Sequence, residues 1–351
     1  MSMKSSLTVC YFGIYSSDFG RNKIYIEAFR KSGHTVIECR DNSKGIAKYF
    51  RLWQKHGRIK DDYDAIIVGY PGHIVVLLAK LLSKKRVVAD ALGSLYDAEV
   101  NSHNPSFLKK LKSFTADWLL VKFADKILLE SFAQKKYFEE KFGKSDKYEV
   151  VYTGADAKFE KFKRTKKINN DNKFLVLFRG KLTPESGIVH ILKAGEILKK
   201  NINISFRVIG SGYFFKETEE FIKTHHLSNV EFLSKYLSGD ELISKMGDAD
   251  LMLGQFESNP RLNRTIPHKA FEAMAMGIPY LTGDGMALKE IAEEGKNAFF
   301  VPLANPRALA EKINFLASEP ELMLKVAINA KIDFDRKFAS HHLVECILQV
   351  L

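Results

Sequence analysis

The feature that most constrains the fold is an alternation of short apolar runs with helical stretches, which occurs twice along the 351 residues. The apolar runs are near-continuous, which is typical of strands buried on both faces of a parallel sheet. Two successive alternations predict the α/β class with two doubly wound, Rossmann-like domains. The predicted strands lie at residues 6–15, 34–40, 65–70, 86–92, 126–131 and 148–154, then at 173–180, 204–210, 229–234, 251–256, 279–285 and 298–302. The predicted helices lie at residues 21–33, 73–85, 105–123, 189–200, 216–226, 238–246, 269–275, 287–293 and 305–318, and from 320 onward.

The boundary between the two predicted domains falls in a polar, basic stretch that lacks hydrophobic periodicity, as a linker does. The sequence therefore predicts domains at residues 1–160 and 173–332, a linker at 161–172, and a final helical segment at 333–351.

The basic character of the chain is concentrated in its first half. Residues 1–164 have a net charge of +11, whereas the remaining residues have a net charge of +1. A basic half is suited to nucleic acid, anionic lipid or an anionic substrate, and it also serves solubility alone. Nucleic-acid binding is not expected, because no strand carries interleaved aromatic and basic residues.

The cysteine content and the apolar runs indicate the compartment. The three cysteines lack the spacing of a metal site or a disulfide framework, which fits a reducing environment. The N-terminus shows no signal-peptide pattern, and no apolar run reaches the roughly 18 residues of a membrane span. We therefore expect a cytoplasmic protein, free in solution or peripheral on the inner face of a membrane.

Residues 266–285 hold the most informative local pattern, a helix opened by Pro267 and followed by a Gly-Ile-Pro turn into a buried strand. Lys269 and Glu272 are three residues apart, so both charges lie on one face near the helix N-terminus. Opposite charges on an otherwise apolar helix need each other or a polar ligand, and a helix N-terminus favours anions. Two interpretations follow, a structural Lys–Glu pair or an anion-binding site.

Several segments together resemble the family 4 glycosyltransferases, which are retaining, nucleotide-sugar-dependent enzymes of GT-B fold. The similar segments are YFGIYSSDFGRNKIYIEAFRKSGHTVIEC and YTGADAKF in the first half, and FRGKLTPESGIVHILKAGEIL, RVIGSGYF, DADLMLGQFE, IPHKAFEAMAMGIPYLT and EIAEEGKNAFFVPLANPRALAEKINFL in the second. The resemblance implies two Rossmann-like domains facing a central cleft, with the acceptor on the N-terminal domain and the donor on the C-terminal one. It also implies that residues 333–351 cross back to the N-terminal domain.

The resemblance implies a hexosyl- or other glycosyltransferase that moves a sugar from a nucleotide-diphosphate sugar to a glycan or lipid-linked acceptor. The diphosphate leaves with negative charge, which a cation stabilises. The family's basic residue after a strand-end glycine matches Lys181 after Gly180, and Arg179 adds a second cation. A further basic position of the family falls on Ser186. Arg179 compensates for this departure, or phosphate binding is weaker.

The family also has two glutamates eight positions apart. The second matches Glu272, which is expected to accept hydroxyls of the nucleotide ribose. The first falls on Arg264, which either approaches the donor phosphate or a negatively charged sugar, or is a surface residue. Lys269 fits a family variant with a lysine shortly before the glutamate. The predicted donor-binding residues are Gly20, Arg179, Gly180, Lys181, Gly210, Arg264, Ile266, Pro267, Lys269 and Glu272.

Three residues are predicted to be catalytic: Asp90, His73 and Lys181. The family places a histidine or an acid after a mid-sheet strand, and His73 and Asp90 lie at or just past the expected carboxyl ends of two strands, beside Ser94 and Asp97. A helix N-cap is the alternative role for residues at such turns. No nucleophile is identified, and many retaining enzymes of this fold use front-face displacement.

No cofactor or metal is expected. The sequence Asp248-Ala249-Asp250 has the spacing of a metal-binding pair, but a cap-and-turn role fits its place between a helix and a strand. The Gly210-Ser211-Gly212 turn lacks the third glycine of a dinucleotide site.

Residues 105–123 mix lysines with large apolar side chains at helical spacing. Such a helix docks on an anionic membrane, or packs on the core with one solvated face. Two further functions remain open. A catalytically silent GT-B partner that binds a nucleotide is suggested by Ser186 and Arg264. A sugar-nucleotide epimerase would need facing carboxylates, for which Glu257 and Asp284 are the candidates.

Overall fold

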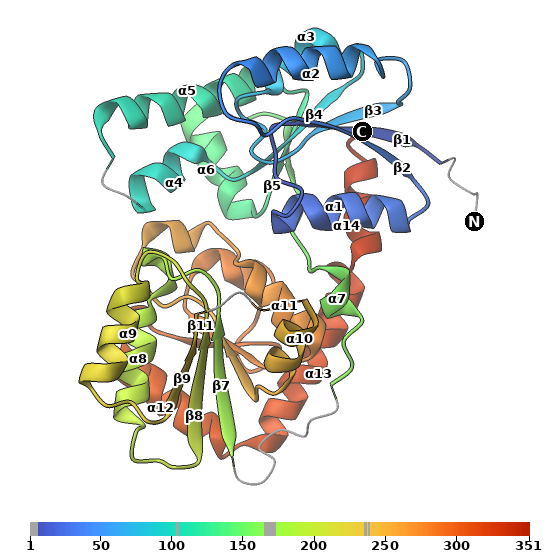
Figure 1. The fold of residues 1–351 in the computed structure, drawn as a ribbon. Coiled ribbons are helices and arrows are strands. Elements are labelled where there is room, and N and C mark those ends of the chain that lie inside the picture. Colours follow the sequence, from blue (N-terminus) through green and yellow to red (C-terminus); the bar gives the residue numbers. More distant parts are fainter. Residues whose placement is uncertain (1–5, 103–104, 165–172, 235–236, 238) are drawn as a thin grey trace. The chain divides into compact units, whose positions relative to one another are not determined.

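The computed structural model describes residues 6–102, 105–164, 173–234, 237 and 239–351, which divide into two compact units (Figure 1). The first unit comprises Met1–Ala157 with Phe338–Leu351, and the second comprises Lys158–Lys337. Residues 165–172 of the predicted linker lie outside the described residues. The segment that rejoins the first unit begins at Phe338 and not at residue 333, because helix α13 continues to Lys337.

The first unit is built on a six-stranded sheet with the order β2-β1-β3-β4-β5-β6. All of its strand pairs are parallel. The last strand is shorter than predicted, because pairing ends at Val150. The strands are β1 (Thr8–Gly13), β2 (Thr35–Arg40), β3 (Ala65–Val68), β4 (Val87–Leu92), β5 (Lys126–Leu129) and β6 (Tyr148–Val150).

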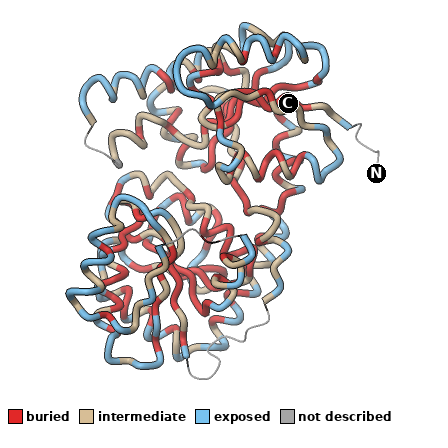
Figure 2. Tube along the Cα trace, in the orientation of Figure 1, coloured by how far each residue is buried: buried red, intermediate tan, exposed pale blue. Residues whose placement is uncertain are grey.

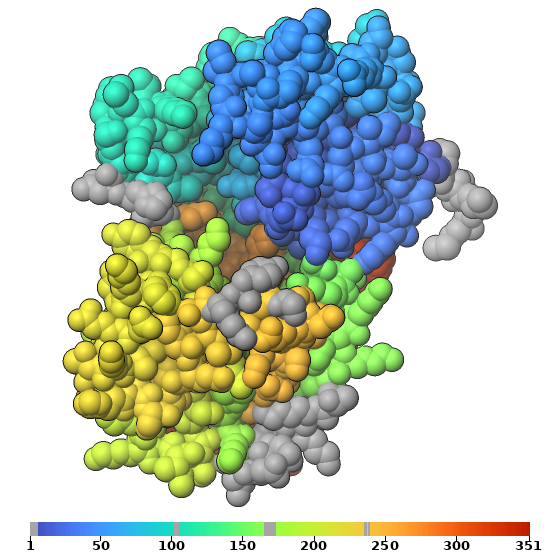
Figure 3. Space-filling view, viewed as in Figure 1, coloured from blue at the N-terminus to red at the C-terminus, as the bar shows by residue number. Residues whose placement is uncertain are grey.

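Helices cover both faces of this sheet, and each face has its own apolar cluster. One cluster joins the sheet to α2, α3, α5 and α6, and the other joins it to α1 and α14. The side chains of α2 (blue) and α5 (teal) lie on the surface of the first unit that Figure 3 shows. The helices are α1 (Gly20–Lys31), α2 (Ala47–Gly57), α3 (Val76–Leu82), α4 (Leu95–Ser102), α5 (Phe107–Phe123), α6 (Phe132–Phe142), α7 (Ala157–Glu160) at the unit boundary, and α14 (Ser340–Leu348).

The second unit repeats the design with a sheet of order β12-β11-β10-β7-β8-β9, again entirely parallel. An apolar cluster joins β7, β8 and β10 to α8, α12 and α13. The strands are β7 (Phe174–Arg179), β8 (Ile204–Ile209), β9 (Val230–Leu233), β10 (Leu251–Leu253), β11 (Tyr280–Gly283) and β12 (Phe299–Val301). The helices are α8 (Ile188–Ile197), α9 (Phe215–Thr224), α10 (Gly239–Gly247), α11 (His268–Met276), α12 (Pro306–Ala317) and α13 (Pro320–Lys337), with 3-10 turns η2 (Pro184–Ser186), η3 (Pro260–Asn263) and η4 (Met286–Glu290).

Buried residues follow the strands in each unit, as Figure 2 shows. The predicted α/β class with two doubly wound sheets is therefore confirmed. One local prediction was wrong: residues 287–293 do not form an α-helix, because the chain makes only the 3-10 turn η4 before a turn at Gly295. No helix within the described residues is long and apolar enough to cross a bilayer.

Helix α14 completes the first unit although it comes last in the sequence. Leu343, Val344 and Ile347 are buried in the cluster that contains Tyr25 and Phe29 of α1. The α1 face of the first sheet therefore depends on a segment that is more than 300 residues away along the chain.

We expect Ile347→Ala to lower the free energy of unfolding of the first unit by about 2–5 kcal/mol, because it leaves a cavity in this cluster. Both tryptophans, Trp53 and Trp118, lie in the first unit, so tryptophan fluorescence during denaturation reports its unfolding selectively. Cys346→Ala on the exposed face of the same helix should change the value by less than about 0.5 kcal/mol. Equal effects of the two variants would contradict the packing described.

Candidate functional site

The candidate site of the second unit lies at the carboxyl end of its sheet, where β7 ends beside α11. Arg179, the last residue of β7, donates from Nη1 to both carboxylate oxygens of Glu272 on α11, at 2.7 Å each. The carboxylate side chain is almost buried, while the guanidinium keeps about a third of its surface exposed. The structure therefore joins two of the predicted donor residues, and Glu272 pairs with Arg179 and not with Lys269.

Lys269 lies in the first turn of α11 and has an unusual environment. Lys269 is only 9% exposed. Its Nζ lies 3.9 Å from the centre of the Phe178 ring, which is a cation–π contact. Within the described residues Nζ makes no hydrogen bond and no ion pair. Burial, together with the nearby Arg179, lowers the pKa of Lys269 from 10.5 to about 7, despite the opposing effect of Glu272. The structure thus holds a buried amine without a neutralising partner.

Two glycines bring the ends of β7 and β8 close to this amine. A side-chain carbon at Gly180 would lie 3.0 Å from Nζ of Lys269, and Gly180 has a φ of +157°. A side-chain carbon at Gly210 would lie 2.0 Å from the carbonyl oxygen of Gly180, so only glycine fits there. Because Gly180 and Gly210 have no side chains, the backbone at the ends of β7 and β8 is uncovered beside Lys269.

The start of α11 adds a second feature that favours anions. The helix begins at His268 after Pro267, and the side chain of Pro267 makes no capping hydrogen bond. The positive end of the dipole of this nine-residue helix lies here. Ile266 is buried beneath the loop that leads into the helix. Positive charge, the positive end of a helix dipole and backbone without side chains thus meet at one end of the sheet.

The other predicted residues of the second unit lie in the loops of this same edge. Lys181 is exposed just after Gly180. Arg264 follows η3, is partly buried and takes part in a polar or ring contact. Ser186 is buried, and its hydroxyl donates to the carbonyl oxygen of Thr183 at 2.6 Å, which closes the turn η2. Ser186 therefore supplies turn structure and no positive charge.

Sequence reasoning missed an ion pair that connects two of these loops. Arg261 of η3 lies 3.1 Å from Glu185 of η2, and the carboxylate is almost buried. A basic residue 76 positions after its partner gives no periodic signal, so only the fold could reveal the pair. The epimerase candidates are each paired too, Glu257 with His190 at 3.3 Å and Asp284 with Lys289 at 2.7 Å.

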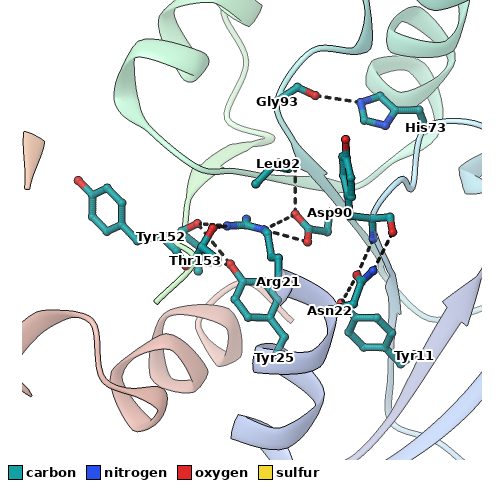
Figure 4. A network of polar contacts seen from close by, with 12 residues as sticks. Tyr11, Arg21, Asn22, Tyr25, His73, Asp90, Leu92, Gly93, Tyr152 and Thr153 are labelled. Carbon is teal, nitrogen blue, oxygen red and sulfur yellow. Dashed lines mark hydrogen bonds and ion pairs between the residues drawn. The ribbon is translucent and has the colours of Figure 1, made fainter. Parts of the chain in front are cut away.

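In the first unit, Asp90 belongs to a fully buried network (Figure 4). Nε of Arg21, from the first turn of α1, donates to both oxygens of Asp90 at 2.9 Å. Nη1 of Arg21 donates to the carbonyl oxygen of Val151 at 2.8 Å and contacts the hydroxyl of Thr153 at 3.1 Å. The amide of Leu92 also donates to Asp90. The geometry favours a structural role for Asp90, and its predicted catalytic role stays a prediction.

His73 is also fully buried. Its Nε2 lies 3.2 Å from the carbonyl oxygen of Gly93 and 3.4 Å from Oδ1 of Asp117. Burial lowers the pKa of His73, and burial raises the pKa of Asp117. Asp117 also accepts hydrogen bonds from Ser94 and from the amides at the start of α4. His73 therefore contacts the aspartate that accepts the first amides of α4, and its catalytic role remains a prediction.

Ser94, which lies near the first sheet, caps a helix, whereas Gly20 only begins one. The hydroxyl of Ser94 accepts from the amide of Asp97 at 2.9 Å, so Ser94 is the N-cap of α4. Gly20 is the first residue of α1 and lies directly before Arg21. The alternative interpretation of this turn, a helix cap, thus describes Ser94.

The two aspartates of the Asp-x-Asp sequence are engaged separately. Asp248 lies 3.1 Å from Arg207, and Asp250 accepts from the amide of Leu175 at 2.8 Å. Among the described residues, no three histidine, cysteine or acidic side chains are grouped as metal ligands.

The family model for glycosyl transferases group 1 matches residues 159–333, which include the whole cluster around Glu272. Residues 159–333 are therefore similar to this glycosyltransferase family. The chain is 30% identical over 163 residues to an uncharacterized glycosyltransferase, MJ1178, of Methanocaldococcus jannaschii, covering 46% of this chain and 43% of the relative. It is 24% identical over 234 residues to the capsular polysaccharide biosynthesis glycosyltransferase CapM of Staphylococcus aureus, covering 63% and 59%. The chain spans about half the length of the first curated relatives it matches.

The fold is shared over nearly the whole chain with solved structures. Anabaena Alr3699/HepE, solved in complex with UDP-glucose, has a TM-score of 0.76 at 18% identity, with 98% of this chain and 99% of that chain covered. This likeness, together with the two parallel sheets, identifies the fold as GT-B.

We expect Asp90→Ala to lower the free energy of unfolding of the first unit by about 3–5 kcal/mol, because Arg21 would be left buried without a counter-charge. The double variant Arg21→Met/Asp90→Ala should recover part of the loss. Asp335→Ala in the exposed Lys331–Asp335 pair serves as the control and should cost less than about 1 kcal/mol. A loss of sugar transfer with unchanged unfolding would instead support the catalytic assignment.

Lys269→Met should stabilise the second unit in a pH-dependent way. The pKa of Lys269 is about 7 in the folded chain and 10.5 ordinarily. Between pH 7 and pH 10.5 the amine therefore loses its proton when the chain folds, and no charge has to be buried. The stability of the unmodified chain should therefore rise by about 1.4 kcal/mol per pH unit across this window relative to the variant. Below about pH 7 the advantage of the variant should be constant and largest. Calorimetric unfolding across the window would reveal this, and a pH-independent difference would contradict it.

Proposed function

We propose that the chain transfers a sugar from a nucleotide-diphosphate sugar to a glycan or lipid-linked acceptor, with retention at the anomeric carbon. The observation that carries this proposal is the buried amine of Lys269, which has no ion-pair partner within the described residues and faces the bare backbone of Gly180. An amine in this position is suited to an anion, since a phosphate would supply the counter-charge that the protein does not.

The diphosphate of such a donor carries its greatest charge as the sugar leaves. Cations fixed at that place stabilise the developing charge because they need no reorganisation during the reaction. Lys269 is fixed by Phe178 and by its helix, and the exposed Lys181 supplies a mobile second cation. The start of α11 adds the positive end of its helix dipole.

Glu272 is suited to hold the nucleotide ribose. Arg179 fixes both carboxylate oxygens, yet each oxygen has a second lone pair that can accept a hydroxyl. The ion pair thus orients the carboxylate while leaving acceptor capacity for a diol. The UDP-glucose complex of HepE and the polysaccharide role in the name of CapM support a sugar nucleotide as donor and a glycan as acceptor.

A second function is favoured by one observation. Ser186 offers no charge where the family resemblance implies a cation, because its hydroxyl is used in its own turn. A chain with a weakened diphosphate site binds a nucleotide without transferring a sugar, as a catalytically silent partner of an active transferase would. Donor binding without any donor consumption would favour this function.

The first experiment is a thermal-shift screen of the full chain against UDP-, GDP- and ADP-sugars in the presence of a metal chelator. One donor class should raise the Tm, and the same donor should then be consumed when acceptor glycans are added. Product analysis by NMR should show the anomeric configuration of the donor retained. Failure of every sugar nucleotide to raise the Tm would overturn both functions.

The affinity for that donor should fall as the pH rises above about 7. Lys269 is charged below its pKa of about 7, and above it each bound donor requires uptake of a proton. The dissociation constant should therefore increase up to about tenfold per pH unit, and this slope should vanish in Lys269→Met. Calorimetric titration measures it, and Lys289→Met, which removes an exposed lysine, serves as the matched control. A slope that persists in Lys269→Met would assign the titration to another group.

A further inference from the structure

A surface cavity of about 220 Å³ lies at the amino end of the second sheet, where β7 and β8 begin. Phe174 and Ile204, the first residues of these two strands, line it, and both belong to the apolar cluster of the unit. The candidate site lies at the other end of the same strands, because Arg179 is the last residue of β7. The five residue steps from Phe174 to Arg179 separate the two places by about 17 Å. The cavity is therefore not part of the site proposed for the donor.

The polar wall of the cavity is made of uncharged side chains. Asn201 and Asn203 come from the loop between α8 and β8, and Asn314 comes from α12. Ser318, which directly follows α12, completes the polar lining. Among the described residues, no acidic or basic side chain lines the cavity. The cavity is therefore suited to an uncharged polar ligand, since a charged ligand would find no counter-charge in its wall.

The asparagine amides keep hydrogen-bonding groups that the protein does not use. Nδ2 of Asn201 donates to Oδ1 of Asn314 at 3.2 Å, and Oδ1 of Asn201 accepts from the backbone amide of Asn203 at 3.1 Å. The first bond orients the Asn314 amide and leaves its Nδ2 group without a partner among the described residues. The side-chain amide of Asn203 makes no hydrogen bond in the described part of the chain. Two amides thus offer donors and an acceptor together, as the hydroxyls of a sugar ring require.

Exposed apolar side chains adjoin these asparagines in the chain. Ile202, between Asn201 and Asn203, is 92% exposed, and Phe315, next to Asn314, is 46% exposed. A sugar ring has an apolar face of C–H groups as well as its hydroxyls, so its binding pockets combine apolar contact with a few placed polar groups. The asparagine wall and its two apolar neighbours supply this combination.

We propose that this cavity binds one sugar ring of an uncharged glycan chain. Asn203 and Asn314 bond hydroxyls of the ring, while Phe315 and Ile202 contact its apolar face. Turn formation explains Asn201, whose oxygen accepts a backbone amide two residues further on, but it does not explain the amides of Asn203 and Asn314. Glycan binding here does not depend on the proposed sugar transfer, because it requires no donor.

The test is saturation-transfer NMR of the full chain with three uncharged oligosaccharides: maltohexaose, laminarihexaose and mannohexaose. At least one of them should receive saturation from the protein, and the transfer should be largest for the protons of a single ring, because the cavity holds one ring. Titration of that oligosaccharide then gives the dissociation constant for each variant.

Two variants remove the polar and the apolar contacts separately. Asn203→Ala/Asn314→Ala should weaken binding at least about tenfold, since one uncharged hydrogen bond contributes about fivefold. Phe315→Ser should weaken binding at least about threefold through lost apolar contact. The matched controls are Asn42→Ala in the first unit and Leu324→Ser on α13, which should bind like the unmodified chain. All changed side chains are exposed, so the four variants should unfold at nearly the same denaturant concentration.

Three outcomes would overturn the proposal: no saturation transfer to any of the three oligosaccharides, undiminished binding by Asn203→Ala/Asn314→Ala, or an equal loss of binding in a control variant. The second outcome would place the glycan elsewhere on the chain, with the proposed transfer site as the next place to test. A thermal shift with a sugar nucleotide would be unaffected by any of these outcomes. Failure of glycan binding at the cavity and failure of the proposed reaction are therefore distinguishable.

Discussion

The ion pair between Arg179 and Glu272 determines which charges remain unpaired at the carboxyl end of the second sheet. By occupying the carboxylate, Arg179 leaves Lys269 as the buried cation that no described carboxylate neutralises. The depressed pKa of Lys269 is the measurable result, because a charge that is desolvated and uncompensated loses its proton more readily. The protein thus keeps an unfavourable charge beside bare backbone, an arrangement that a bound anion would stabilise.

The first unit also contains an ion pair between an arginine and a carboxylate, and there the pair is fully buried. Asp90 and Arg21 form a fully buried ion pair that connects α1 to strand β4 and to the segment that follows β6. Such a pair adds little net stability over apolar packing, but losing one partner is costly. It fixes the start of α1.

Prediction from the sequence succeeded where the hydrophobic pattern within one element indicates its structure. Continuous apolar runs identified both parallel sheets, and the pattern around Lys269 and Glu272 identified helix α11, where both charges are almost buried. Prediction failed where partners are far apart in the chain. Arg21 and Asp90 are 69 positions apart, and Arg179 and Glu272 are 93 apart, so no spacing rule connects them. The α-helix predicted at residues 287–293 was wrong, because the same apolar pattern is compatible with the 3-10 turn η4.

The sequence by itself determined the fold class, the doubling of the strand–helix pattern, the uneven charge and the residues gathered near the start of α11. Each of these follows from composition or from a period within one element. Tertiary structure decided which charges are paired and that Asp90 and His73 are buried. These properties depend on which elements pack together, and packing brings together residues that no local pattern relates.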